Sequence, residues 1–363
     1  MGLATGMIIS LARAAAEFAE SEQAGLTVNA ERCLHRVNKL STCTGCVDAC
    51  PVAALRLHST DGRTRIALDS ETCLKCGVCV PVCPVGAIEG RQDATKLLAS
   101  VAQRQKRGIL ELTCALHPTP EKGPPQSDLV IRTDGCLGSL GASLLTSFYA
   151  LGVYHVLLRV DVCASCPLGQ ARAQINQTAG QVNSLFAADA MLASPVTLLE
   201  TASGDWPSRP VIAARTPPET RRDFLRSLMT PQEVPGEVRQ LALEEQTSGT
   251  RQPPAERRRL RQALQFLSQD LLSPEPLAAF PAAQIAANDS CNACGVCARS
   301  CPTGAIAFDV DDDHHYRLSF TAGACTDCGV CLDLCEQHAL HRAGVPTLSD
   351  WLAAEPQILQ TGE

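Results

Sequence analysis

The stretch that decides the fold reads CNACGVCARSCP and occupies residues 291–302. Two residues separate each of its first three cysteines from the next, and three residues separate the third from the fourth. Thiolates spaced in this way on a curling loop can bind three irons of one cubane, while the fourth cysteine leaves on a helix. The proline that follows suits the start of that helix, because proline lacks an N–H and has a fixed φ angle. The stretch therefore predicts a cysteine-bound [4Fe–4S] cluster.

The chain contains three further copies of this pattern. Residues 73–84 repeat it in full, and residues 325–336 repeat the cysteines but carry glutamate in place of the proline. The remaining copy, residues 43–51, lacks its first cysteine because Leu40 stands at that position. Cys33 is the cysteine left to supply the missing ligand, and a three-iron cluster at this site is the alternative. Four copies arranged as two pairs indicate a duplicated module.

These motifs make residues 26–90 and 284–342 resemble the bacterial two-[4Fe–4S] ferredoxin family. The resemblance implies a small α+β fold built from βαβ repeats, and one-electron transfer. Zinc is the alternative metal, since Cys-x2-Cys pairs also form zinc ribbons. Closely spaced cysteines repeated four times favour iron–sulfur clusters over zinc.

In two-cluster ferredoxins the fourth cysteine of each run ligates the other cluster of the pair. This crossover predicts four sets of four ligands, which are named here as sites I to IV. Site I is Cys33, Cys43, Cys46 and Cys83; site II is Cys50, Cys73, Cys76 and Cys79; site III is Cys291, Cys294, Cys297 and Cys335; site IV is Cys301, Cys325, Cys328 and Cys331.

The cysteine content and the net charge limit which redox compartment and which partners are expected for the protein. The 363 residues include twenty cysteines, and the formal net charge is −7. Disulfides would call for an export signal, but Arg13 interrupts the apolar run of residues 1–20, and acidic residues follow it. We expect an amphipathic helix there and reduced, metal-bound cysteines in the cytoplasm. The acidic charge disfavours nucleic acid as a partner, and no segment has the length and apolarity expected of a membrane span.

Between the cysteine-rich ends, strand and helix signals alternate, which is typical of an α/β domain with a parallel sheet. Strands are expected at residues 109–116, 128–134, 153–162 and 196–200, and helices at residues 137–151 and 169–192. Gly152 is expected to end the first of these helices.

Four cysteines lie at the ends of the first three of these strands: Cys114 is near the end of the first, Cys136 follows the second, and Cys163 and Cys166 follow the third. In a parallel sheet these positions share the carboxyl edge, where ligands of open α/β sheets bind. The sequence therefore suggests a fifth metal site, which would hold a [2Fe–2S] cluster or Zn. The alternative is that Cys114 and Cys136 are buried small residues, since free cysteine is among the most buried residue types.

The central segment also resembles a known family. An apolar strand before Cys136, a helix, a strand at residues 153–160 and then a loop with paired cysteines are similar to the hydrogenase iron–sulfur subunit family. That resemblance implies electron relay into heterodisulfide reductases. The thioredoxin-like [2Fe–2S] ferredoxins are a second similar family.

We expect six segments in the chain. They are an N-terminal helix at residues 1–25, a ferredoxin-like dicluster domain at 26–95, the central α/β domain at 96–200, a helical linker at 201–283, a second dicluster domain at 284–345 and a tail at 346–363. Within the linker, helices are expected at residues 217–229 and 255–271. The chain has motifs for many redox centres but no recognisable substrate or nucleotide motif. This combination predicts the electron-relay subunit of a larger oxidoreductase complex, with redox proteins as partners. The alternatives are a metal- or flavin-dependent oxidoreductase in the central domain, fed by the clusters, and a redox or iron sensor.

Overall fold

The computed structural model describes residues 26–90, 94–104, 108–186, 194–202, 205–213, 235–242 and 251–362. The chain divides into two compact units. The first unit consists of Met1–Arg91, Ser248–Arg257 and Pro274–Glu363, so it holds both cysteine-rich ends; the second consists of Gln92–Thr247 and Arg258–Ser273. The helix expected at residues 1–25 lies outside the described residues.

The N-terminal cysteine-rich segment contains two antiparallel strand pairs, β1 with β4 and β2 with β3. Asp61 and Gly62 join β2 to β3, and both have positive φ angles, of 52° and 69°. Such a two-residue Asp-Gly turn matches the twist of a hairpin. The elements are β1 (Leu26–Val28), η1 (Ala30–Arg32), α2 (Leu34–Val37), α3 (Gly45–Asp48), β2 (Leu55–Thr60), β3 (Arg63–Leu68) and β4 (Ile88–Gly90).

The C-terminal cysteine-rich segment repeats this arrangement. Strand β10 pairs with β13 as β1 pairs with β4, and β11 pairs with β12 as β2 pairs with β3. A further strand, β14, joins β12 on its other side. The elements are β10 (Gln284–Ala287), α10 (Val296–Ser300), β11 (Ile306–Val310), β12 (Tyr316–Phe320), η6 (Ala322–Ala324), α11 (Val330–Asp333), β13 (Leu340–Gly344), α12 (Leu348–Leu352) and β14 (Gln357–Gly362). The duplication expected from the cysteine spacing is confirmed in the fold.

The second unit is built on a five-stranded sheet in the order β8-β7-β5-β6-β9. All of its neighbouring strands are parallel, which confirms the α/β prediction. The strands are β5 (Ile109–Thr113), β6 (Leu129–Arg132), β7 (His155–Arg159), β8 (Val196–Leu199) and β9 (Ile212–Ala213). Strands β6 and β7 flank β5 on opposite sides, so the chain reverses its direction of travel across the sheet at β5. In open α/β sheets, ligands bind in the crevice at such a point.

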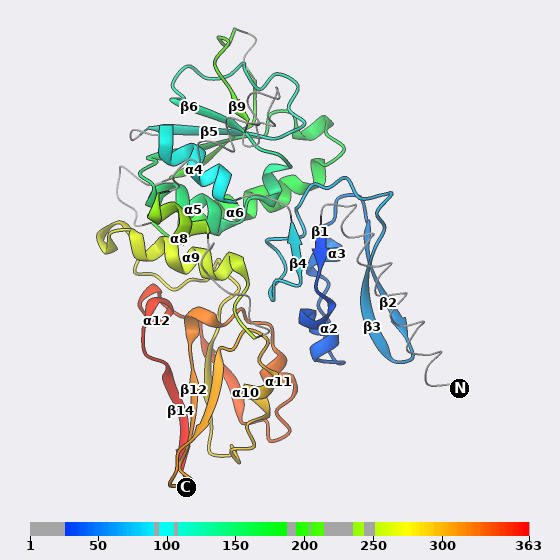
Figure 1. Cartoon of the computed structure of the whole chain (residues 1–363), viewed down its shortest axis with the longest axis vertical. Helices are drawn as coiled ribbons and strands as arrows, with labels where there is room; N and C mark the ends of the chain where they lie inside the picture. Colours follow the sequence, from blue (N-terminus) through cyan, green and yellow to red (C-terminus); the bar gives the residue numbers. More distant parts are fainter. Residues whose placement is uncertain are drawn as a thin grey trace, which may run out of the picture. The chain divides into compact units, whose positions relative to one another are not determined.

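Helices pack beside this sheet (Figure 1). They are α4 (Ala94–Arg104), η2 (Leu137–Ser139), α5 (Ala142–Ala150), η3 (Cys163–Ser165), η4 (Gly169–Ala171), α6 (Arg172–Ser184), α8 (Gly236–Ala242), α9 (Ala255–Phe266) and η5 (Gln269–Leu271). Eight of the nine residues of α5 are buried. Two hydroxyl groups on α5, those of Thr146 and Ser147, donate to the carbonyl oxygens of Ala142 and Ser143 at 2.8 Å, so burial leaves them satisfied. Gly152, with φ of +90°, follows the end of α5 as expected.

Residues 201–283 contain more than helices. Strand β9 joins the edge of the central sheet beside β6. The helix expected at residues 255–271 is observed as α9, followed by the single turn η5. The first three residues of α9 belong to the first unit and the rest to the second. The helix expected at residues 217–229 lies outside the described residues.

Candidate metal centres

Two cavities in the first unit are each lined by four cysteines. One, of about 370 Å³, is lined by the cysteines of site IV: Cys301, Cys325, Cys328 and Cys331. The other, of about 310 Å³, is lined by the cysteines of site II: Cys50, Cys73, Cys76 and Cys79. The rest of both linings is mainly apolar, including Ile285, Ile306 and Phe320 at site IV. Thiols that surround an apolar cavity suit a cluster with cysteine ligands, because each thiolate can then reach a different iron atom.

The cysteines of site I also lie close together. Burial raises the pKa of the Cys46 thiol to about 12, and repulsion by the thiolates of Cys83, Cys43 and Cys33 adds to the increase. Such a thiol is protonated in the free protein at neutral pH. Ligands bind iron as thiolates, so loading this site must release protons.

Site III follows the same pattern. Burial raises the pKa of the Cys297 thiol to about 11, and the charges of Cys291, Cys294 and Cys335 contribute to the increase. The structure therefore brings together all four members of each set, although the members of one set are far apart in the sequence.

Cys33 reaches site I through a detour in the chain. The single turn η1 ends directly before Cys33, and the short helix α2 begins directly after it. The Cys33 side chain is 9% exposed, whereas Leu40, at the position where the other runs have their first cysteine, is 69% exposed. The detour thus directs Cys33 inward and turns the residue at the usual ligand position outward.

The fourth cysteine of every run is held by the same local turn. Its sulfur accepts a hydrogen bond from the backbone N–H of an alanine four residues later. The four bonds are Ala54 N–H to Cys50 Sγ at 3.2 Å, Ala87 N–H to Cys83 Sγ at 3.1 Å, Ala305 N–H to Cys301 Sγ at 3.2 Å, and Ala339 N–H to Cys335 Sγ at 3.3 Å. A donor aimed at sulfur stabilises the thiolate, and hydrogen bonds to cluster sulfurs influence the reduction potential.

The turn requires a left-handed residue directly before that alanine. The four residues are Ala53 (φ 52°), Gly86 (φ 62°), Gly304 (φ 67°) and His338 (φ 49°). Glycine adopts this conformation without steric cost, while an L-residue such as Ala53 is strained there. The sequence signal for this turn is the alanine that all four copies share, four residues after the last cysteine of the run.

The ligand loop of site I differs from the other three. In the complete runs the residue before the second cysteine and the glycine after it both have positive φ angles. These pairs are Lys75 (55°) and Gly77 (76°), Ala293 (56°) and Gly295 (66°), and Asp327 (50°) and Gly329 (77°). In the incomplete run the residue after the second-position cysteine is Thr44, which has a φ angle of −121° and directly precedes helix α3. The missing first cysteine therefore goes with a different backbone conformation around Cys43 and Cys46.

The four central cysteines also line one cavity, of about 350 Å³, at the carboxyl edge of the parallel sheet. Cys114 directly follows β5, Cys136 follows β6, and Cys163 and Cys166 follow β7. Burial raises the pKa of the Cys163 thiol to about 11, with contributions from the charges of Cys114 and Cys166. The backbone N–H of Leu168 donates to Cys166 Sγ at 3.4 Å.

A buried ion-pair network reaches this cavity through Arg159, one of its lining residues. The Arg159 guanidinium donates to Glu111 Oε1 at 3.0 Å and to Asp161 Oδ2 at 2.9 Å. Arg209 donates to both carboxylate oxygens of Glu111, at 2.7 and 2.9 Å. His117, three residues after Cys114, lies 3.3 Å from Asp161 Oδ1 and accepts from the N–H of Thr119 at its other ring nitrogen. Sequence reasoning missed this network, although Glu111 and Arg159 interrupt otherwise apolar strands.

All twenty cysteines lie in described residues, and none is in a disulfide. In the described ranges, no three Cys, His, Asp or Glu side chains converge on a point where one metal ion could sit. This holds for the cysteines of sites I to IV as well. No helix in the described part of the chain is long and apolar enough to cross a membrane.

Both cysteine-rich ends of the chain match a known family of domains. Residues 41–87 and 290–339 each match the family model of the 4Fe-4S dicluster domain. The two modules, with their cysteine-lined sites, are therefore similar to iron–sulfur dicluster domains of the ferredoxin type. The family matches lie outside the central unit, whose resemblance to hydrogenase iron–sulfur subunits stays a prediction.

Two curated relatives are ferredoxins. A ferredoxin of Rickettsia felis is 41% identical over 46 residues, which are 13% of this chain and 38% of the relative. A ferredoxin of Alicyclobacillus acidocaldarius is 42% identical over 43 residues, which are 12% of this chain and 50% of the relative. The chain thus spans half or less of the length of these relatives. No solved structure matches the chain.

Proposed function

We propose that this chain is the electron-relay subunit of a larger oxidoreductase complex in the cytoplasm, and that it carries four [4Fe–4S] clusters. Its partners would be redox proteins that donate and accept single electrons. The observation that carries the proposal is the grouping of sixteen cysteines into four sets of four, two of them around cavities of 310 and 370 Å³. A chain that holds several one-electron centres in one compact unit is suited to transferring electrons between partners.

The residues proposed to hold the clusters are the members of sites I to IV. The crossover of ligands supports this assignment, because the fourth cysteine of each run groups with the thiols of the neighbouring run. Cys301, for example, lines the site IV cavity together with Cys325, Cys328 and Cys331. When bound, the clusters would supply one-electron chemistry, while the chain supplies thiolates and N–H donors to sulfur.

We further propose that the four central cysteines bind a fifth metal centre. They line one cavity, as the cysteines of site II and of site IV each do. Either an iron–sulfur cluster or a zinc ion can take four cysteine ligands. Arg159, which also lines this cavity, is paired with Glu111 and Asp161.

Counting metal tests both proposals. We would measure total iron, zinc and acid-labile sulfide per chain after anaerobic purification. About 16 iron and 16 sulfide would support four cubanes alone, about 18 of each would add a [2Fe–2S] centre, and about 20 would add a further cubane. In the Cys163→Ser/Cys166→Ser variant the count should return to about 16. Zinc with little iron would overturn the electron-transfer assignment.

Reduction tests the relay role. A photoreduced deazaflavin is a low-potential one-electron donor, and we expect it to bleach the visible absorption of all clusters. Failure of this donor to reduce any cluster in the iron-loaded protein would contradict the relay. Tightly bound flavin, or substrate turnover that depends on the central cysteines, would favour the alternative in which the central domain is an oxidoreductase.

A further inference from the structure

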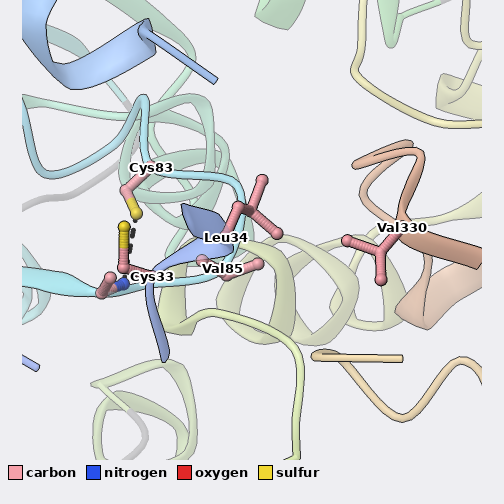
Figure 2. Packing of buried hydrophobic residues seen from close by; sticks show 6 residues of the cluster. Cys33, Leu34, Cys83, Val85 and Val330 are labelled. Carbon is pink, nitrogen blue, oxygen red and sulfur yellow. Dashed lines mark hydrogen bonds between the residues drawn. The ribbon is translucent and has the colours of Figure 1, made fainter. Parts of the chain in front are cut away.

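The two dicluster modules contact one another within the first unit, and the contact is made beside their metal sites. A single buried apolar cluster contains Leu34, Val85 and Val330. Leu34 directly follows Cys33, Val85 lies two residues after Cys83, and Val330 directly precedes Cys331. Figure 2 shows Leu34 and Val85 next to Cys33 and Cys83, with Val330 directed toward them from helix α11.

Burial shows that this contact is well packed. Val330 and Val85 are each 1% exposed, and Leu34 is 4% exposed. Two ligand cysteines, Cys43 of site I and Cys328 of site IV, pack against the same cluster. The apolar contact therefore lies between site I in one module and site IV in the other.

A hydrogen bond between the modules accompanies the apolar contact. Asn38 Nδ2 donates to Asp333 Oδ2 at 2.9 Å, across 295 positions of sequence. Asn38 is 2% exposed, and its side-chain oxygen Oδ1 accepts a hydrogen bond from the backbone N–H of Leu40 at 2.9 Å. Because a buried polar group is costly to leave unpaired, this bond favours one docking geometry of the two modules over others.

Within each module, the two sites are also neighbours. Cys46 of site I packs in one buried cluster with Cys79, Cys50 and Cys73 of site II. In the other module, helix α10, which carries Cys297 of site III, packs against helix α11, which carries Cys331 of site IV. These neighbours and the contact between the modules place the sites in one linear order, II–I–IV–III.

We propose that electrons pass directly between the two modules across the Leu34–Val85–Val330 contact, from site I to site IV or in reverse. The inference rests on the cluster assignment proposed above. One electron leaves the cluster at one site, which is oxidised, and reduces the cluster at the other, so no proton or further reactant is needed. A one-electron donor reaches one end of the series, site II or site III, and an acceptor reaches the opposite end. Partners would then bind at sites II and III, and sites I and IV would serve internal transfer.

The variant that tests this route is Asn38→Asp. Its carboxylate keeps the acceptor for the Leu40 N–H but faces the carboxylate of Asp333, so attraction becomes repulsion. At mildly alkaline pH we expect the ratio of docked to separated modules to fall roughly tenfold or more, since a buried hydrogen bond is lost and like charges meet. The double variant Asn38→Asp/Asp333→Asn restores a donor opposite a carboxylate and should recover docking.

Two readouts separate the possible outcomes. In the fully reduced protein, spin coupling between the clusters of sites I and IV should broaden the electron paramagnetic resonance spectrum. Asn38→Asp should remove that component and the double variant should return it, while coupling within each module is common to all three proteins. Hydrogen–deuterium exchange at residues 330–334 should rise and fall in parallel.

Iron content distinguishes failure of the proposed route from failure of the cluster assignment. If Asn38→Asp keeps about 16 iron or more and its exchange at residues 330–334 rises while its spectrum still matches that of the unaltered protein, the route between the modules is refuted. If the unaltered protein itself holds fewer than about 16 iron, the four-cluster assignment fails first.

Discussion

The buried carboxylate of Glu111 should be worth several kcal/mol to the central unit. It has no exposed side-chain surface and accepts from Arg159 at 3.0 Å, from Arg209 at 2.7 and 2.9 Å, and from Ser127 at 2.6 Å. Glu111→Gln keeps the shape but removes the charge, and it turns an amide N–H₂ toward a guanidinium. Both arginines then lose a carboxylate in a buried place, although Arg159 keeps its bond to Asp161.

The size of the effect follows from the difference between buried and exposed ion pairs. Removing one partner of a buried pair costs about 3–5 kcal/mol, because the other charge is left uncompensated. That free energy corresponds to a fall of roughly two to three and a half orders of magnitude in the ratio of folded to unfolded protein. With a urea dependence of about 1–3 kcal/mol per molar, the unfolding midpoint should fall by roughly 1–5 M.

A matched control lies in the same unit. Glu200 accepts from Arg172 at 2.6 Å, but the two side chains are 59% and 34% exposed. Glu200→Gln makes the same chemical change at an exposed pair, where we expect a cost of about 1 kcal/mol or less.

The assay uses the two tryptophans of the chain, one in each unit. Trp206 lies in the central unit, where the Arg159 guanidinium is 5.0 Å from its ring centroid. In a Trp351→Phe background, Trp206 emission follows urea unfolding of the central unit alone. Equal midpoints for Glu111→Gln and Glu200→Gln would refute the reasoning that burial makes the Glu111 pairs strong.

Three further outcomes are expected. Ala53→Gly should raise the melting temperature of the first unit slightly and Gly304→Ala should lower it, because left-handed backbone costs an L-residue about 1–2 kcal/mol; calorimetry that gives both changes the same sign would contradict this. Arg257 is 5% exposed and its charge acts on the thiolate of Cys325. Because Arg257→Met removes this positive charge, a redox titration should find the midpoint potential of site IV lower by on the order of 50 mV, with unchanged iron content. Burial raises the pKa of Glu111 and Asp161, but hydrogen bonds from their partners outweigh it and hold both pKa values below the usual range. The unfolded chain therefore binds more protons in acid, and the stability of the central unit should be lost as pH falls below about 4; a flat profile of the Trp206 midpoint against pH would exclude this role.

The ligand sets could be predicted because their chemistry is local. Cysteine spacing constrains which irons a loop can reach, and the repetition of one spacing revealed two similar modules. Even the substitute role expected of Cys33 needed only the absence of a cysteine at position 40 and one cysteine left over. The parallel sheet could also be predicted, since β6 and β7 are short, largely apolar runs separated by helix α5. Such runs are typical of strands buried on both faces.

The left-handed residues before the alanines could be predicted from the sequence only in part. Gly86 and Gly304 suggest such a turn, but Ala53 and His338 occupy the same conformation without glycine. Their strain is tolerated because the turn delivers an N–H to a cysteine sulfur, a benefit that no local propensity reports.

Cysteine spacing alone thus determined that the chain has ferredoxin-type cluster motifs and predicted which cysteines of neighbouring runs lie together. Only the tertiary structure decided which sites face each other across the modules and which charges surround the central cysteines. The contacts between Leu34 and Val330 and between Glu111 and Arg159 join residues from separate elements, whose side chains meet only once the whole chain has folded. Sequence periodicity describes the face that a side chain occupies, whereas the identity of its partner depends on how those faces pack.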